Sequence, residues 1–198
     1  MKKIISILAA LVLSFSTQAT LISIELDNTG YSVGDTLTAQ VIISDIEDDL
    51  SGFQKLLADF TFTLGYSSSV TSFSSVLFGN KLDVDFFSLI PSDQYFDDSV
   101  MNELTVSEFS YADSFDLATA QNSFNSFVLA TLSFNVISAG NNYFSINSMT
   151  LGDDFSDSFA SINLEKSIEF TVTEVPEPAS IFLVLMGLSF LVARKKSL

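Results

Sequence analysis

The chain has 198 residues, 24 of them acidic and 8 basic, and it contains neither cysteine nor histidine. This composition excludes disulfides, Ser-His-Asp and Cys-His nucleophile arrangements, and zinc sites with histidine ligands. Residues 20–178 carry all 24 acids but only three bases, Lys55, Lys81 and Lys166. A body so strongly negative repels nucleic acid and anionic lipid, so we expect neither as a partner.

Residues 1–19 have the pattern of a secretory signal peptide. Lys2 and Lys3 form a cationic start, Ile4 to Phe15 is a short apolar run, and Thr17-Gln18-Ala19 places small residues where signal peptidase reads them. The pattern predicts export by the Sec machinery and cleavage after Ala19. The alternatives are a buried N-terminal helix or a membrane anchor, for which the run is short.

Residues 20–174 alternate apolar and polar side chains with the period of a β-strand. Five stretches show the alternation and predict half-buried antiparallel strands: Thr36–Ser44, Ala58–Tyr66, Phe127–Ile137, Asn141–Leu151 and Ser167–Val175. In Ala58–Tyr66, for example, Phe60, Phe62 and Leu64 share one face. Short helical turns are predicted near Lys55–Leu57 or Leu117–Ser123. The predicted fold is an all-β, antiparallel β-sandwich.

Three segments of this body resemble the cohesin domain, a jelly-roll sandwich related to some cellulose-binding modules. They are "YSVGDTLTAQVIIS", "FTFTLGYSSSVTSF" and "LATLSFNVISAGNNYFSI", which occur in this order. The features that carry the likeness are Val33-Gly34-Asp35 before a strand, Phe60 to Tyr66, and Leu129 to Phe134 followed by Ala139-Gly140. The resemblance implies a jelly-roll body that acts as a binding module.

Acidic residues gather in loops between the predicted strands. One cluster holds Asp45, Glu47, Asp48 and Asp49, a second holds Asp153, Asp154 and Asp157, and a third holds Asp93, Asp97 and Asp98. Calcium binds six to eight oxygen ligands, so the first two clusters are candidate calcium sites. None follows the EF-hand pattern. The alternative is a solvated acidic loop, and no other cofactor is expected.

Aromatic residues bear on the question of a carbohydrate ligand. The chain has 20 Phe, 5 Tyr and no Trp. Phe is typical of sandwich cores, whereas surfaces that bind sugars favour Trp and Tyr, whose rings stack and whose polar atoms hydrogen-bond. The absence of Trp therefore disfavours carbohydrate binding without excluding it. Tyr66, Tyr95, Tyr111 and Tyr143 are the residues available for such a role.

Residues 175–198 end the chain with Pro176, Glu177 and Pro178, then an uncharged run from Ala179 to Ala193, then Arg194, Lys195 and Lys196. As a helix the run is about 22 Å long at 1.5 Å per residue, a short transmembrane span whose basic end stays in the cytoplasm. The order of these features resembles the PEP-CTERM sorting signal of Gram-negative bacteria. In that family exosortase, a transpeptidase-like membrane enzyme, reads the motif. An ordinary single-span anchor is the alternative.

The predicted function is that of a non-catalytic binding or structural module. The expected protein is exported, anchored transiently in the inner membrane, processed by exosortase, and left at the cell surface or outside the cell with exopolysaccharide or biofilm. The absence of His and Cys and of any nucleophile motif argues against an enzyme. A secreted polysaccharide-acting enzyme or a carbohydrate-binding module remains the alternative.

Overall fold

The computed structural model describes residues 19–49, 51–84, 90–155, 157–165, 167–175 and 186. Nearly all of the predicted signal peptide and membrane span lies outside these ranges. So do the residues of the predicted sorting motif and the basic end, Pro176, Glu177, Pro178, Arg194, Lys195 and Lys196. Across the ranges that are described, the structure contains no helix with the length and apolar character needed to cross a membrane.

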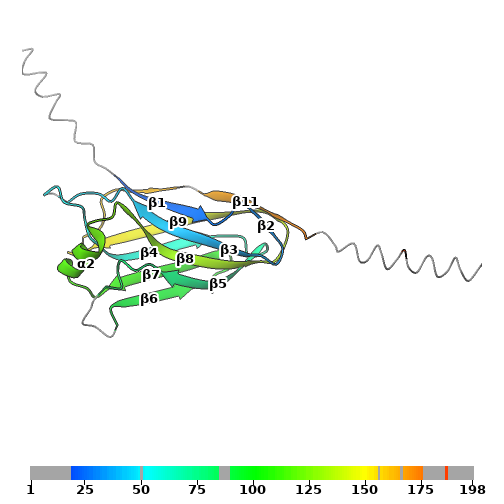
Figure 1. The fold of residues 1–198 in the computed structure, drawn as a ribbon, viewed down its shortest axis with the longest axis horizontal. Helices are drawn as coiled ribbons and strands as arrows, with labels where there is room; N and C mark the ends of the chain where they lie inside the picture. The colour runs from blue at the N-terminus through cyan, green and yellow to red at the C-terminus, as the bar shows by residue number, and fades with distance from the viewer. Residues whose placement is uncertain are drawn as a thin grey trace, which may run out of the picture.

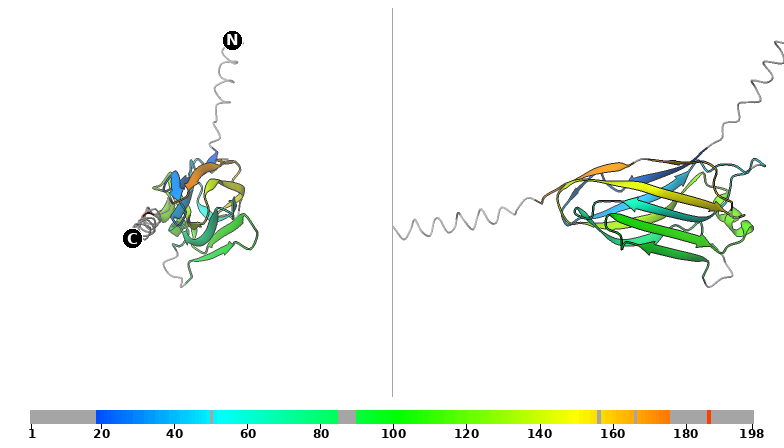
Figure 2. Two further views of the ribbon diagram at one scale, coloured as in Figure 1. Left: turned by 90° about the vertical axis from the view of Figure 1, so that its right-hand side faces the viewer. Right: turned by 180° about the vertical axis from the view of Figure 1, so that it is seen from behind.

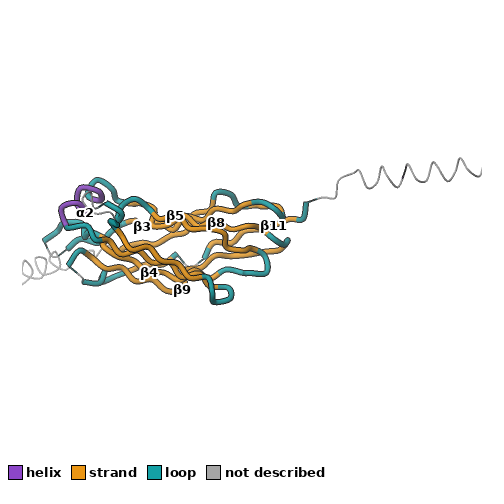
Figure 3. Tube along the Cα trace, turned by 90° about the horizontal axis from the view of Figure 1, so that it is seen from below, coloured by secondary structure: helices purple, strands orange, loops and turns teal. Residues whose placement is uncertain are grey.

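Eleven strands in the described part of the chain form two sheets that pack face to face (Figures 1 and 3). The five-stranded sheet has the order β10 (Ile162–Leu164), β1 (Thr20–Leu26), β3 (Thr36–Ser44), β8 (Ser126–Val136) and β5 (Thr71–Phe78). The six-stranded sheet has the order β2 (Gly30–Ser32), β11 (Ile168–Thr173), β9 (Gly140–Asp153), β4 (Leu57–Gly65), β7 (Glu103–Ser110) and β6 (Ser92–Asp97). The predicted all-β sandwich is confirmed.

Hydrophobic alternation placed five strands correctly. The predicted strand Thr36–Ser44 has the bounds of β3, and the other four predictions overlap β4, β8, β9 and β11, with ends that differ by one or two residues. Phe60, Phe62 and Leu64 are all buried, as their shared face in β4 requires. The pattern therefore reports which side of each strand faces the core.

The turn before β3 is built from Val33, Gly34 and Asp35. Gly34 has a φ of 96°, a conformation that side chains with a Cβ rarely adopt. The Gly34 N–H donates to the carbonyl of Val136 (2.8 Å), and the Val136 N–H donates to the carbonyl of Asp35 (2.9 Å). These bonds join the turn to the end of β8 and so fix where β3 enters the sheet.

Helix α2 (Ser114–Gln121) is the helix between β7 and β8. Asp113 caps its first turn by accepting from the N–H groups of Phe115 and Asp116. At its other end the buried Gln121 side chain accepts from the Leu57 N–H (2.8 Å) and donates to the Leu57 carbonyl (2.8 Å). The helix prediction for Leu117–Ser123 is therefore confirmed in part. The prediction for Lys55–Leu57 is wrong, because β4 begins at Leu57.

Aromatic rings connect the two sheets through the core. Phe134 of β8 lies 4.8 Å from Phe144 of β9, measured between ring centroids, and 5.1 Å from Tyr66. Phe144 in turn lies 5.2 Å from Phe170 of β11. These separations are typical of favourable aromatic pairs. Core packing therefore carries the stability of a chain that has no disulfide.

The strand connections fall at the two ends of the sandwich. β1 begins at the end where α2 lies, and β11 finishes at the opposite end (Figure 1). We call the first the loop end, because it carries the long connections 45–56 and 154–161. The chain beyond Thr173 continues from the other end toward the predicted sorting motif.

Candidate functional site

The loop end brings two of the predicted acidic clusters together around one lysine. Lys55 Nζ lies 2.9 Å from Glu47 Oε1 and 3.7 Å from Asp153 Oδ2. The side chains of Lys55, Glu47 and Asp153 are only 16%, 9% and 7% exposed. All three residues line a wide depression of about 1,630 Å³ between the connections of the loop end. Lys55 is thus the cation that compensates the two most buried acids of the predicted calcium clusters.

Hydrogen bonds and charge shift the proton affinities of this group. Burial alone raises the pKa of Glu47, but the N–H groups of Ala160 and Ser161 and the Lys55 ammonium together hold it below its usual value. Burial lowers the pKa of Lys55, but the hydrogen bond and charge of Glu47, with the charge of Asp153, raise it overall. Both groups are therefore charged at neutral pH.

Acids of the two clusters also stabilise their own loops or face solvent. Asp49 Oδ1 accepts from the N–H groups of Ser51 (2.7 Å) and Phe53 (3.0 Å). Asp153 Oδ1 accepts from those of Phe155 (3.0 Å) and Asp157 (2.8 Å). The exposed acids are Asp45, Asp48, Asp49 and Asp157, while Asp154 is half-buried. Among the described residues, no group of three or more acids is arranged to hold a metal ion. Calcium binding stays a prediction.

The outer face of the six-stranded sheet carries a regular array of small hydroxyl side chains, and Figure 2 (right) shows its strands β9, β4, β7 and β6 side by side. We define the hydroxyl rows from the strand register: Thr150, Thr61 and Ser107 are cross-strand neighbours in one row, and Ser148, Thr63 and Thr105 in the next. The hydroxyls of Thr63 and Thr105 lie 3.4 Å apart. The side chains at all six positions are short, so none of them protrudes far from the sheet.

Aromatic and acidic side chains border the hydroxyl rows. Tyr95 pairs with Ser107, and Phe109 occupies the outward position beside Asp59. Both rings are about half exposed. Asp93 and Asp97 of the third acidic cluster lie on the edge strand β6. Of the described cations, Lys55 lies at the loop end and Lys81 sits 3.5 Å from the ring centroid of Phe124. The described part of this face is therefore neutral at its centre and negative at its margins.

A buried carboxylate fixes the edge strand β6 beneath this face. Glu108 points inward from β7 and accepts from Ser92 Oγ (2.8 Å) and Gln94 Nε2 (2.8 Å) of β6. Burial raises the pKa of Glu108, and these two hydrogen bonds only partly oppose that shift. Glu108 thus positions the strand that carries Tyr95, Asp93 and Asp97.

The four tyrosines considered for sugar contacts have different environments. Tyr66 is buried against Phe134, so it is not available for contacts with a sugar. Tyr95, Tyr111 and Tyr143 are each about half exposed. The hydroxyl rows were not predicted as a site. The signal for them is the alternation itself, since Thr61 and Thr63 occupy the outward positions between Phe60, Phe62 and Leu64.

No family model and no curated protein matches the chain. Solved structures, in contrast, match the fold of the chain. The second type II cohesin module from the adaptor ScaA scaffoldin of Acetivibrio cellulolyticus superposes with a TM-score of 0.64 at 13% identity, covering 83% of this chain and 96% of that one. The cohesin module of a Clostridium perfringens family 33 glycoside hydrolase gives 0.59 at 11% identity, covering 80% and 100%.

A third similar structure is a type II cohesin–X-dockerin complex from Acetivibrio cellulolyticus, with a TM-score of 0.61 at 13% identity, covering 78% of this chain and 99% of the matched one. At these identities the similarity establishes the fold alone. The sandwich is cohesin-like, and the predicted resemblance in fold is confirmed.

Proposed function

We propose that this chain is a non-catalytic binding module of an exported protein, associated with exopolysaccharide at the cell surface or in the matrix outside the cell. The observation that carries the binding role is a cohesin-like sandwich whose outer face is formed by the hydroxyl rows and bordered by half-exposed aromatic rings. The association with exopolysaccharide is supported by the resemblance of residues 175–198 to a sorting signal. A similar cohesin domain comes from the cellulosome of Acetivibrio cellulolyticus, which supports an extracellular role.

A protein partner docks on the hydroxyl rows in this proposal. Two of the similar structures are cohesins in complexes with dockerins. Aromatic side chains are enriched in protein interfaces, and Tyr95, Phe109 and Tyr111 border the rows. Within the described strands of the five-stranded sheet, Leu77 is the one large and strongly exposed apolar side chain on the outer face. That face therefore offers fewer apolar contacts to a protein partner than the face with the hydroxyl rows. The acidic margins, with Asp59, favour a partner with cationic side chains and association that weakens with salt.

The test places the same bulky cation on either outer face. Thr63→Arg puts a long side chain in the middle of the hydroxyl rows, and Thr131→Arg puts it at a half-buried outward position of β8. Proteins of the producing strain's extracellular fraction are cross-linked to the exported wild-type chain and to each variant. We expect Thr63→Arg to lose the captured partner while Thr131→Arg retains it. Equal capture by both variants contradicts docking on the hydroxyl rows.

A secreted enzyme that acts on polysaccharide is the alternative function. The chain has no histidine or cysteine, and the cohesin-like fold supports a binding role instead. Incubating the exported chain with exopolysaccharide of its host distinguishes the two. Release of reducing ends would overturn the non-catalytic proposal, whereas co-sedimentation without release supports it.

Exosortase processing is the second part of the proposal and is supported by the sequence. An N-terminal segment with the pattern of a signal peptide, residues 1–19, precedes the sandwich. Pro176-Glu177-Pro178, the apolar run 179–193 and the cations Arg194, Lys195 and Lys196 follow it in order. In this proposal the apolar run anchors the exported body transiently in the inner membrane, the cations fix its orientation, and exosortase cuts near the Pro-Glu-Pro motif.

Replacing Pro176, Glu177 and Pro178 by three alanines separates sorting from simple anchoring. Export and insertion will continue, because the apolar run and the cations remain. Processing will stop, and a longer, membrane-retained form will accumulate. Mass spectrometry of the mature C-terminus is the measurement. An ordinary anchor predicts full-length protein for both the wild type and the triple-alanine variant. A mature wild-type protein that keeps Leu198 in a strain with exosortase therefore refutes the sorting signal.

A further inference from the structure

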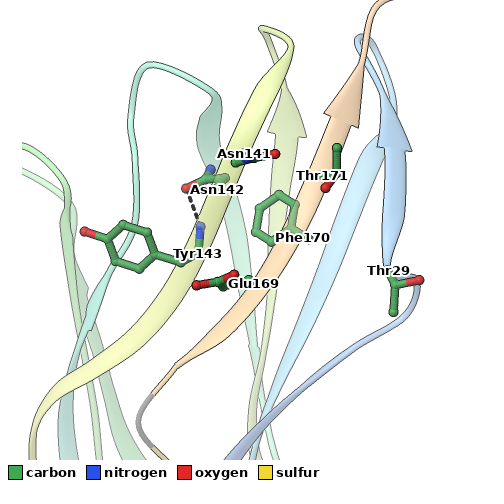
Figure 4. A pocket seen from close by; sticks show the side chains of 7 residues that line it. All are labelled: Thr29, Asn141, Asn142, Tyr143, Glu169, Phe170 and Thr171. Atoms are coloured by element: carbon green, nitrogen blue, oxygen red, sulfur yellow. Dashed lines mark hydrogen bonds between the residues drawn. The ribbon is translucent and has the colours of Figure 1, made fainter.

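A polar hollow of about 470 Å³ lies at one margin of the six-stranded sheet, beyond the hydroxyl rows (Figure 4). Two cross-strand pairs form it: Tyr143 of β9 is opposite Glu169 of β11, and Asn141 is opposite Thr171. The neighbouring residue on β2 is Gly30, opposite Thr171, and it has no side chain to fill the space. Thr29 closes the far side. The volume is within the range of small-molecule sites, about 300–1,000 Å³.

Buried side chains hold the base of the hollow rigidly. Asn142 points inward, where its Oδ1 accepts from the N–H groups of Tyr143 (2.7 Å) and Ser67 (3.3 Å), and its Nδ2 donates to Thr71 Oγ1 (3.2 Å). The ring of Phe170 is buried against Phe144. A ligand therefore meets a preformed surface and loses little free energy to ordering the protein.

The side chains that face outward combine an aromatic ring with uncommitted hydrogen-bonding groups. Tyr143 is 49% exposed and lines the hollow, and Figure 4 shows its ring on the side of β9 away from Thr171 and Thr29. Within the described chain, the side-chain polar groups of Asn141, Tyr143, Glu169 and Thr171 have no hydrogen-bond partner. Together they supply an amide, a phenol, a carboxylate and a hydroxyl, which both donate and accept hydrogen bonds.

We infer that this hollow binds an uncharged sugar unit of a polysaccharide. The ring of Tyr143 stacks against the apolar face of a pyranose, and Asn141, Glu169 and Thr171 hydrogen-bond its hydroxyl groups. The inference rests on the proposed association with exopolysaccharide and names the site and the ligand class. It does not depend on the hydroxyl rows, which dock a protein.

Charge decides between neutral and acidic sugars. Glu169 is the charged residue of the hollow, and neither described cation, Lys55 nor Lys81, lines it. Uronate, sulfate and phosphate groups would meet a carboxylate with no compensating cation, in a chain of formal charge −16. Binding of a neutral sugar has little dependence on ionic strength, unlike the docking on the hydroxyl rows.

The test uses exopolysaccharide of the producing strain, separated by anion exchange into a neutral and an acidic fraction. Affinity of the exported, mature chain for each fraction is measured by affinity electrophoresis. Two substitutions remove the site: Tyr143→Ala takes away the ring, and Gly30→Leu fills the hollow. A Cβ at Gly30 meets no atom within 4 Å, so this change leaves the fold intact. Tyr143→Phe keeps the ring, and Phe115→Ala on α2 is the control, because this ring is 77% exposed and belongs to neither proposed site.

We expect the wild type, Tyr143→Phe and Phe115→Ala to bind the neutral fraction, and Tyr143→Ala and Gly30→Leu to bind it roughly tenfold more weakly. Melting curves of all variants will coincide. If the wild type binds but the two site variants bind equally well, the polysaccharide association stands and this site is wrong. Binding confined to the acidic fraction overturns the neutral ligand. No binding to either fraction overturns the association itself, and capture of a protein by the hydroxyl rows is unaffected.

Discussion

Replacing Phe134 by alanine will lower the free energy of unfolding by about 4 kcal/mol, because the change removes a fully buried ring and leaves a cavity between the sheets. Phe134 contacts rings of both layers, with Tyr66 at 5.1 Å, Phe73 at 5.7 Å and Phe144 at 4.8 Å between centroids. No neighbour is free to collapse into the space, since each is itself held in the aromatic chain.

Urea denaturation followed by circular dichroism measures this loss. The control is Phe115→Ala on α2, where the ring is 77% exposed, and we expect a change within about 0.5 kcal/mol. A loss below about 1 kcal/mol in Phe134→Ala would show that the core tolerates the cavity by rearranging, contrary to the packing described. The comparison is direct because the chain has no disulfide to mask a weakened core.

Alternation along the sequence located strands whose inward positions are mostly apolar. β3 is the best case: Leu37, Ala39, Val41 and Ile43 are buried and the residues between them are not. The same rule gave the inward face of β4. The sandwich follows from these strands, because half-buried antiparallel strands bury their apolar faces against a second sheet.

Several of the strands that were not predicted break the alternation or are very short. β7 has Glu108 at an inward position, and a carboxylate there makes the stretch appear polar on both faces. β5 contains a register shift between Phe73 and Ser75, which interrupts its period of two. β2 and β10 have three residues each, too few to show a period. In β7 and β5 the cause is a hydrogen bond or a pairing partner far away in the sequence.

The candidate sites were predictable in different degrees. The acidic loops were identified as clusters, but their meeting at Lys55 depends on β4 and β9 lying side by side, which no local pattern reports. Tyr143 was among the residues considered for sugars. Its neighbour Glu169 comes from β11, and only the register between β9 and β11 places the two together. Composition identified the residue types, and the topology determined the partners.

Replacing Lys55 by methionine will lower the free energy of unfolding by about 3 kcal/mol at pH 7, because it leaves Glu47 and Asp153 nearly buried without a cation. Methionine preserves most of the side-chain volume, including the contact with Phe159, over whose ring Lys55 Nζ lies at 5.2 Å. The loss therefore reports charge and not packing. Lys81→Met is the matched control, since Lys81 contacts Phe124 and pairs with no described acid, and we expect it to cost less than about 1 kcal/mol.

The pH dependence of the Lys55→Met deficit distinguishes an ion pair from a packing defect. The pKa of Glu47 lies below its usual 4.5 in the folded wild type, so this group stabilises the fold above 4.5 and loses that contribution as pH falls through its folded pKa. Removing Lys55 raises the pKa of Glu47, so acid neutralises Glu47 at a higher pH in the variant than in the wild type. The difference in stability between wild type and Lys55→Met will therefore be largest near pH 7 and shrink below pH 4.5. The Lys81→Met difference will stay constant over that range. A Lys55→Met deficit that is the same at neutral and acid pH would show that the lysine stabilises the loop end by packing alone.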